Sequence, residues 1–174
     1  LDDIAARREK VVVFVQHFDV QDVVARAIRA RYGLDHMPGK INGTMPPAAR
    51  QRVVTEFQDG RPGFDAVVLT GRAAGTGLTL TAANHVVHLE RWWNPAVEDQ
   101  CSDRVYRIGQ TKDVMVHVPL AVFREEVDPA DSPFDVTLHQ FLERKRSRSQ
   151  SVLAPSSGKG DQEFIESFFG KKAD

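Results

Sequence analysis

The sequence predicts an α/β fold in which helices sandwich a parallel sheet, followed by a C-terminal helical extension. Residues 10–15 and 65–69 are continuous apolar runs, a pattern typical of strands that are buried on both faces of a parallel sheet. Segments with the period of amphipathic helices separate such runs, so strands and helices alternate along the chain. With 174 residues, of which 41% are hydrophobic, the chain can bury one core and a few appendages.

The first part of the chain predicts two strand–helix units. After the strand at 10–15, Asp19 is expected to cap a helix, because an aspartate side chain accepts hydrogen bonds from the free N–H groups of a first turn. A short strand is expected at 39–43, and a second helix begins after Thr44 and ends at Gly60. The apolar faces of the two helices are Val20, Val23, Val24, Ala27 and Ile28 in the first and Ala49, Val53, Val54 and Phe57 in the second.

The centre of the chain adds three strands and one helix. The strands are predicted at 65–69, 85–89 and 114–118. Asn94 suits the N-cap of a helix, Pro95 its first position and Gly109 its end. One face of this helix would carry Gln100, Arg104 and Arg107, and the opposite, apolar face would carry Val97, Cys101, Val105 and Ile108. The two arginines are therefore expected to point outward, at something anionic.

The pattern changes after the last predicted strand. Residues 121–135 are acidic and contain prolines, which indicates a surface connection. A helix at 136–145 follows and ends in a basic run. Residues 147–160 are rich in Ser, Gly and Pro and are expected to be flexible, and a last short helix capped by Asp161 would expose an aromatic cluster. We divide the chain accordingly into residues 1–120, 121–150 and 151–174.

Composition restricts the classes of function. The formal net charge is −1 and the pI is near 6.7, so any DNA contact must come from a local basic surface or from backbone amides. The single cysteine, Cys101, excludes an internal disulfide and a zinc cluster, and no metal role is expected for His85 and His88, since no further ligand accompanies them in the sequence. No apolar run of membrane-spanning length and no signal sequence is found, so we expect a cytoplasmic protein without a membrane partner. The start at Leu1, without an initiator Met, suggests a fragment.

The central helix and the segment before it carry an ordered set of motifs. They are Ala74-Gly75-x-Gly77-Leu78-x-Leu80-Thr81, Trp93-Asn94-Pro95 and Gln100-x-x-x-Arg104-x-x-Arg107-Ile108-Gly109-Gln110. In this combination the chain resembles the Swi/Snf-type ATPases of helicase superfamily two at their motifs V and VI, and in particular their bacterial branch. The resemblance implies that residues 1–120 form the second of two RecA-like lobes, with ATP bound in the cleft between them. It also implies that the helix at 136–145 is a brace across both lobes, whereas a solvated helix end is the alternative.

The resemblance assigns roles in ATP hydrolysis. Arg104 and Arg107 would be arginine fingers, the catalytic residues that neutralise charge on the γ-phosphate. Residues that would bind ATP are Gly75, Gly77 and Gln100. The alternative for the arginines is an ion pair with Glu98, Asp99 or Asp103 on a solvated helix, and the alternative for the glycines is an ordinary turn.

A second group of residues would contact DNA. Thr70, Gly71 and Arg72 follow a strand at the edge of the sheet where ligands bind in open α/β folds, and in the family this position meets the phosphodiester backbone. Their donors suit phosphates and read no base, so the expected binding is not sequence-specific. Trp93 would couple the DNA groove to the ATP site. The alternatives are a merely exposed charge for Arg72 and corner packing for the adjacent Trp92 and Trp93.

Four positions depart from the residues that are usual in the family. They are Ala74 in place of Gly, Thr79 in place of Asn, Glu90 in place of Asp and Tyr106 in place of His. Ala74 would stiffen the turn of motif V, and Thr79 removes an amide that would order it. These departures bear on efficiency more than on family membership.

The chain lacks the other half of an ATPase site. It contains no Gly-x-x-x-x-Gly-Lys-Ser/Thr loop and no Asp-Glu-x-His box, so ATP and Mg²⁺ would be bound mainly by an N-terminal RecA-like lobe. The implied function is half of an ATP-dependent double-stranded DNA translocase in the nucleoid, inactive without its first lobe, with RNA polymerase or repair proteins as candidate partners. The alternatives are a degenerate RecA-like module that only binds a partner, and a lobe of another helicase class.

Overall fold

The computed structural model describes residues 1–71, 77–123 and 133–150, with the backbone alone described at 148–150. The chain divides into two compact units, Leu1–Pro119 and Leu120–Asp174. The described part of the second unit contains α6 (Phe134–Gln150), which is longer at both ends than the predicted helix. Residues 147–150, which we expected in a flexible linker, are therefore helical, whereas the predicted short helix after Asp161 lies outside the described residues.

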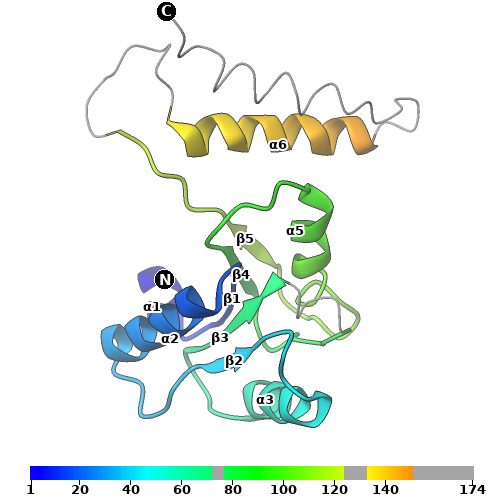
Figure 1. Ribbon diagram of the computed structural model, residues 1–174. Coiled ribbons are helices and arrows are strands. Elements are labelled where there is room, and N and C mark those ends of the chain that lie inside the picture. The colour runs from blue at the N-terminus through cyan, green and yellow to red at the C-terminus, as the bar shows by residue number, and fades with distance from the viewer. Residues whose placement is uncertain (72–76, 124–132, 151–174) are drawn as a thin grey trace, which may run out of the picture. The chain divides into compact units, whose positions relative to one another are not determined.

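One parallel sheet forms the centre of the first unit (Figure 1). Its strands are β1 (Lys10–Val15), β2 (Gly39–Ile41), β3 (Asp65–Thr70), β4 (His85–His88) and β5 (Met115–His117). The strand order is β2-β3-β1-β4-β5, and Val12 of the central strand pairs with Val67 on one side and Val86 on the other. The predicted fold class is confirmed, and all five predicted strands are present.

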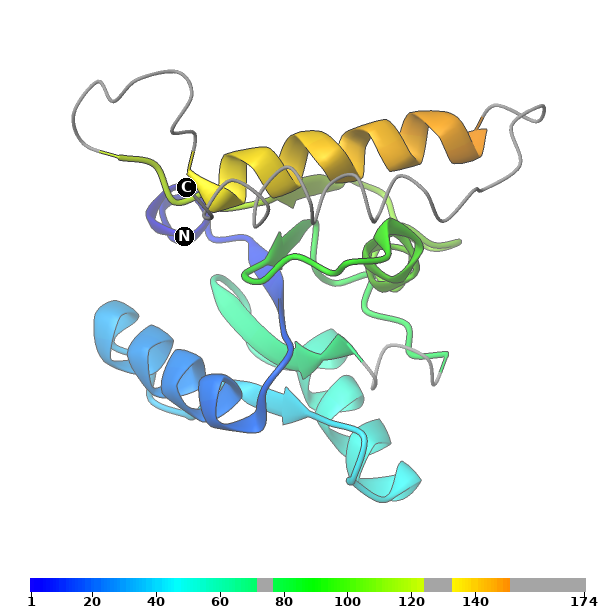
Figure 2. The same cartoon turned by 45° about the horizontal axis from the view of Figure 1, so that its top comes forward.

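Helices cover both faces of this sheet (Figures 1 and 2). On one face lie α1 (Asp2–Ala6), which the sequence did not predict, and α2 (Phe18–Tyr32). The opposite face carries α3 (Pro47–Asp59) and α5 (Pro95–Ser102). Because successive strand residues point to opposite faces, Val11 and Val13 pack under α1 and α2, whereas Val12 and Phe14 pack under α3 and α5.

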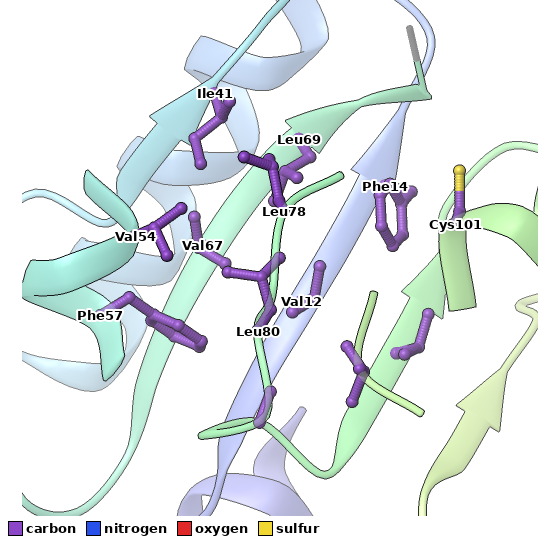
Figure 3. Packing of buried hydrophobic residues seen from close by; sticks show 13 residues of the cluster. Val12, Phe14, Ile41, Val54, Phe57, Val67, Leu69, Leu78, Leu80 and Cys101 are labelled. Atoms are coloured by element: carbon purple, nitrogen blue, oxygen red, sulfur yellow. The ribbon is translucent and has the colours of Figure 1, made fainter. Parts of the chain in front are cut away.

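The segment between β3 and β4 completes the second of these apolar layers. Leu78 and Leu80 extend over β3 and β1 (Figure 3). Leu80 is fully buried, and Cys101 of α5 and Val105 after it belong to the same cluster. The core therefore anchors the stretch before β4 to the stretch after α5, although neither stretch is a strand.

α2 differs from its prediction at its start and along its buried face. His17 is the N-cap residue, so Asp19 lies in the first turn, where its charge suits the helix dipole, rather than capping the helix. Val23 is 59% exposed, and the buried residues of α2 are Gln21, Ala25 and Ile28. The buried face is turned toward Gln21 because its Nε2 donates hydrogen bonds to the carbonyls of Ile41 (3.0 Å) and Val68 (2.8 Å).

α5 is shorter than predicted, and this changes the setting of both arginines. The helix ends at Ser102, so Arg104 and Arg107 lie in the turns after it and do not share a helical face with Gln100. Ile108 is fully exposed, and its predicted place on the apolar face is wrong. After Ser102 the N–H groups of Arg104 and Val105 donate to carbonyls three residues back, and the Arg104 carbonyl accepts a hydrogen bond from the N–H of Leu80 at 2.8 Å. In the described part of the chain, no helix is long and apolar enough to cross a membrane.

Candidate functional site

The turns after α5 are fixed by the segment that precedes β4. Besides the bond from Leu80 to Arg104, the Nε2 of Gln110 donates to the carbonyls of Thr81 (3.1 Å) and Ala83 (2.6 Å). The Oε1 of Gln110 accepts hydrogen bonds from the backbone N–H groups of the next two residues, which closes the turn. Two stretches that the sequence predicted as separate motifs are thus joined by backbone and side-chain hydrogen bonds.

Arg104 and Arg107 lie together at this junction. Both line a hollow of ≈ 640 Å³, whose other described lining residues are Asp103, Tyr106, Ile108, Gln110 and Lys112. The Nη1 of Arg107 donates to the carbonyls of Gly77 (3.2 Å) and Leu78 (3.4 Å). The Nε of Arg104 is buried and has no hydrogen-bond partner among the described residues. Neither arginine forms an ion pair within the described part of the chain, so the predicted alternative of a surface salt bridge is not what holds them.

The three residues predicted to bind ATP have different settings. Gly77 is exposed and has a positive φ of 72°, a conformation that favours glycine. Gln100 lies exposed on α5, outside the described lining of the hollow. Gly75 lies outside the described residues, as do Ala74 and Arg72. Gly77 contacts Arg107 through its carbonyl, and the described Gln100 does not line the hollow.

The predicted DNA-binding residues Thr70 and Gly71 lie at the carboxyl end of β3. Both are buried, and the hydroxyl of Thr70 has no hydrogen-bond partner among the described residues. Gly71 is covered by the ring of Trp92, since a Cβ added at Gly71 would lie 2.1 Å from the Cζ2 of Trp92. Corner packing, which we had kept as an alternative, thus describes Trp92, whereas Trp93 is 40% exposed.

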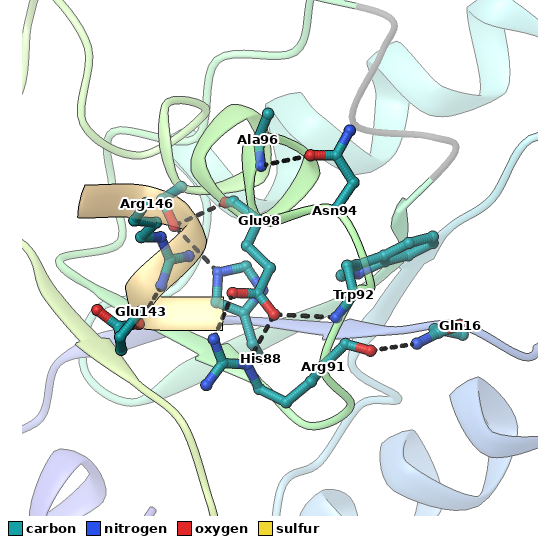
Figure 4. Close-up of polar contacts among 10 residues, drawn as sticks. Gln16, His88, Arg91, Trp92, Asn94, Ala96, Glu98, Glu143 and Arg146 are labelled. Atoms are coloured by element: carbon teal, nitrogen blue, oxygen red, sulfur yellow. Dashed lines mark hydrogen bonds and ion pairs between the residues drawn. The ribbon is translucent and has the colours of Figure 1, made fainter. Parts of the chain in front are cut away.

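A buried ion pair underlies this tryptophan corner (Figure 4). Arg91 and Glu98 bond through two pairs of atoms, Nε to Oε1 at 2.8 Å and Nη2 to Oε2 at 3.0 Å. Their side chains are 5% and 1% exposed. The Oε1 of Glu98 also accepts the backbone N–H of Trp92 at 2.9 Å. The Glu98 carboxylate therefore binds Arg91 and the backbone of Trp92. It does not pair with Arg104 or Arg107, which was the alternative that the sequence had left open.

Sequence reasoning missed several residues of this region. Lys112 adds a third cation to the hollow, and Gln110, although part of the recognised motif, was given no role. The pairing of Arg91 with Glu98 went unnoticed, although their spacing across the start of α5 could have suggested it. Cys101, which was expected on the apolar face of the helix, is buried, and burial raises the pKa of its thiol to about 12.

A second polar cluster lies at the amino-terminal ends of β1 and β4 and shares Lys112 with the hollow. The ring nitrogens of His85 lie 2.8 Å from the Oε2 of Glu9 and 3.0 Å from the Nε2 of His117. The Nζ of Lys112 donates to the other oxygen of Glu9. These bonds, that of His85 first, lower the pKa of the Glu9 carboxyl to about 2. Among the described residues no group of His, Cys, Asp and Glu is arranged to hold a metal ion.

Comparison with known proteins places this geometry in a family. The helicase conserved C-terminal domain family matches residues 1–109. The chain belongs to this family. This helicase C-terminal domain is 36% identical over 162 residues to the Zorya protein ZorD of Escherichia coli, and 39% identical over 127 residues to YwqA of Bacillus subtilis. The matches cover 90% and 72% of the chain, but only 14% and 13% of the lengths of these relatives.

Solved structures agree with the family assignment. The helicase C-terminal domain superposes on the SWI2/SNF2 ATPase core of Sulfolobus solfataricus in complex with double-stranded DNA with a TM-score of 0.67 and 29% identity, over 95% of this chain and 33% of that one. The C-terminal part of the Fun30 ATPase domain gives a TM-score of 0.68 at 23% identity, over 96% of this chain and 50% of that one, which bears on the fold alone. The predicted resemblance to a Swi/Snf-type C-terminal lobe with a RecA-like fold is therefore confirmed.

Proposed function

We propose that this helicase C-terminal domain is the second lobe of an ATP-dependent double-stranded DNA translocase, with Arg104 and Arg107 as its arginine fingers. The observation that carries the proposal is that both arginines line one hollow. They set two guanidinium groups against the carboxylate of Asp103, while Lys112 is paired with Glu9, and this balance favours a polyanionic ligand such as the phosphates of a nucleotide. The buried, unsatisfied Nε of Arg104 fits the same kind of ligand.

ATP and Mg²⁺ would be held mainly by a first RecA-like lobe, since no phosphate-cradling loop is present in this sequence. The chemistry that such a lobe supplies is transfer of the γ-phosphoryl group to water. The contribution of this chain is to place guanidinium groups where negative charge develops on the transferred group. Gly77 and Gln100, with Gly75, would contact the nucleotide from this side.

DNA would bind at the carboxyl end of β3, through Thr70, Gly71 and Arg72. The hydroxyl of Thr70 is a donor that the described chain leaves unsatisfied, and ligands of open α/β sheets bind at this edge. Donors of this kind meet phosphates, so binding should be weak, independent of sequence and shallow in its salt dependence, because few counterions are released. One of the similar solved structures is a complex with double-stranded DNA, which supports a duplex as the substrate. Trp93 would couple this contact to the hollow.

The experiment that tests the proposal uses the complete two-lobe protein. Duplex DNA should stimulate its ATP hydrolysis, and the protein should displace a triplex-forming strand from a duplex in an ATP-dependent way without separating the duplex strands. Strand separation of a forked duplex would instead indicate another helicase class. Absence of DNA-stimulated hydrolysis would favour the degenerate binding module. The 174-residue chain alone should bind ATP poorly and hydrolyse it negligibly, in a preparation free of contaminating ATPase.

A further inference from the structure

The ring of Trp92 rests directly on the backbone of Gly71. Three ring atoms of Trp92 would lie 2.1–2.8 Å from a Cβ at Gly71, and that is closer than any side chain at Gly71 could permit. Gly71 follows Thr70, the last residue of β3. The corner between β4 and α5 is therefore seated on the end of β3, at the residues proposed to meet DNA.

Two directional contacts hold this corner in place from other elements. Glu98 of α5 accepts both the Arg91 guanidinium and the backbone N–H of Trp92 on its carboxylate (Figure 4). Gln16, which follows β1, donates from its Nε2 to the carbonyl of Arg91 at 2.8 Å. Because these bonds hold the carbonyl and the N–H of the single peptide that joins Arg91 to Trp92, they fix the orientation of that peptide and so where the Trp92 ring can lie.

The energetics of the ion pair favour a role in positioning. Taking two charges out of water costs about as much as their attraction returns, so an apolar pair of similar volume often stabilises a fold equally well. A buried pair is, however, directional, and this one also satisfies a backbone N–H that would otherwise lack an acceptor. What Arg91 and Glu98 provide beyond an apolar pair is therefore a fixed orientation of the corner.

We infer that Arg91 and Glu98 are positioning residues that hold Trp92 on Gly71 and so tie α5 to the end of β3. Arg104 and Arg107 follow directly after α5, and the tie therefore links the proposed ATP-contacting turns to the proposed DNA-contacting residue. The expected loss of coordination rests on the proposed function. Whether Arg91 and Glu98 hold Trp92 on Gly71 can be measured without it. Loss of the tie should leave both sites formed and should impair their coordination.

The test is a double variant that removes the charges and keeps the volume, Arg91→Met with Glu98→Leu. In the two-lobe protein the melting temperature should fall by only a few degrees, because the Trp92 N–H loses its acceptor. DNA-stimulated turnover should fall by about 10-fold to 100-fold, the usual effect of small displacements far from the chemistry. The KM for ATP and the affinity for duplex DNA should change much less. The matched control is Asp2→Asn with Arg31→Gln, which removes an exposed ion pair whose side chains are each 66% exposed and should change none of these values.

A second measurement reports the tie without any activity. The 174-residue chain has two tryptophans, so a Trp93→Phe background leaves Trp92 as the single fluorophore. Acrylamide should quench Trp92 more strongly in the double variant than in the background. Unchanged quenching together with wild-type DNA stimulation would overturn the inference.

If the double variant fails to fold, the neutral pair Arg91→Gln with Glu98→Gln replaces it. This variant keeps an oxygen that can accept the Trp92 N–H, leaves no unpaired buried charge and removes the ion pair, so a partial loss of DNA stimulation is expected and wild-type behaviour would overturn the inference. If the wild-type two-lobe protein shows no DNA-stimulated turnover, the proposed function fails. The quenching result then still decides whether Arg91 and Glu98 position Trp92.

Discussion

The backbone N–H of Leu80 donates a 2.8 Å hydrogen bond to the carbonyl oxygen of Arg104. Leu80 is fully buried, so this bond attaches the turn that carries Arg104 to the hydrophobic core. Arg107 reaches the same stretch through the carbonyls of Gly77 and Leu78. The two arginines are thus presented from a backbone that is fixed at several points, which is what pre-organised stabilisation of charge requires.

Gln110 should be needed for the stability of this junction. Its Nε2 satisfies carbonyls of Thr81 and Ala83, so Gln110→Ala would leave part-buried acceptors without partners and should lower the free energy of unfolding by about 1–3 kcal/mol. Urea denaturation of the chain measures the change. Gln100→Ala, at an exposed position of α5, is the matched control and should change stability by less than about 0.5 kcal/mol. Equal effects of the two variants would show that the hydrogen bonds of Gln110 contribute little.

Gly71→Ala should destabilise the fold by overpacking. The added methyl group would lie 2.1 Å from the Trp92 ring, and forced shifts of this kind cost about 1–3 kcal/mol. The cause is tested by a double-mutant cycle in which Gly71→Ala is repeated in a Trp92→Ala background. If the clash with the ring is responsible, the second cost should be much smaller. A cost that is the same in both backgrounds would place the strain elsewhere in the turn.

Cys101 should be inert in the folded chain. Its side chain is 1% exposed and burial raises the pKa of the thiol to about 12, so almost no reactive thiolate is present near neutral pH. A thiol reagent such as 5,5′-dithiobis(2-nitrobenzoate) at pH 8 should react with the folded chain only at the rate of unfolding. In urea it should titrate the one cysteine of the sequence fully. Fast labelling under native conditions would contradict the packing of α5 described above.

Glu9 should contribute to stability in a way that depends on pH. Its pKa is lowered from the ordinary 4.5 to about 2, chiefly by its hydrogen bond to His85. The folded state thus favours the ionised carboxyl, and this contribution is fully present above pH 4.5 and is lost as the pH falls from 4.5 toward 2. Glu9→Gln should therefore destabilise the chain at pH 6, and its difference from the wild type should shrink by pH 3.

The urea midpoints of the wild type and of Glu9→Gln, measured between pH 3 and pH 6, test this expectation. Glu56→Gln, at an exposed position of α3, serves as the control and should follow the wild type at every pH. A Glu9→Gln effect that does not vary with pH would assign the contribution of Glu9 to packing rather than to its charge.

The sequence predicted those parts of the fold that local patterns determine. The apolar runs of β1 and β3 indicated buried parallel strands because such strands need apolar side chains on both faces. The N-cap of α5 was also predicted, and the side chain of Asn94 accepts the N–H of Ala96 as expected. The motif spacing also predicted that Arg104 and Arg107 lie close together, and both line the same hollow.

The errors arose where contacts distant in the sequence decide the structure. α5 ends at Ser102, and the carbonyl of Arg104, which helical periodicity would assign to the helix, instead accepts the N–H of Leu80, 24 residues earlier in the chain. The buried face of α2 turns toward Gln21, a polar residue that a hydrophobic pattern places outside and that two main-chain carbonyls of the sheet bring inside. The seat of Trp92 on Gly71 likewise depends on a close approach that no local pattern encodes.

The central claim is that Arg107 acts in hydrolysis rather than in the fold. Arg107 is exposed, and its described contacts are two hydrogen bonds to main-chain carbonyls, so Arg107→Ala should leave the hydrophobic core intact and lower the melting temperature little. Arg107→Lys keeps the charge but loses the planar fork of donors, and it should not restore activity. Arg104→Lys should likewise not restore the activity lost in Arg104→Ala. Because the Nε of Arg104 is buried, substitutions there also disturb the packing, so Arg107 is the better site for this comparison.

The most direct measurement is single-turnover ATP hydrolysis by the two-lobe protein with duplex DNA, for the wild type, Arg107→Ala and Arg107→Lys, beside their melting temperatures. If Arg107 stabilises charge that develops on the γ-phosphate, hydrolysis by Arg107→Ala should fall by about 10³-fold or more, with much smaller changes in nucleotide and DNA affinity. Hydrolysis at the wild-type rate in a folded Arg107→Ala protein would contradict the proposal and reduce Arg107 to a residue that fastens the turn at Gly77.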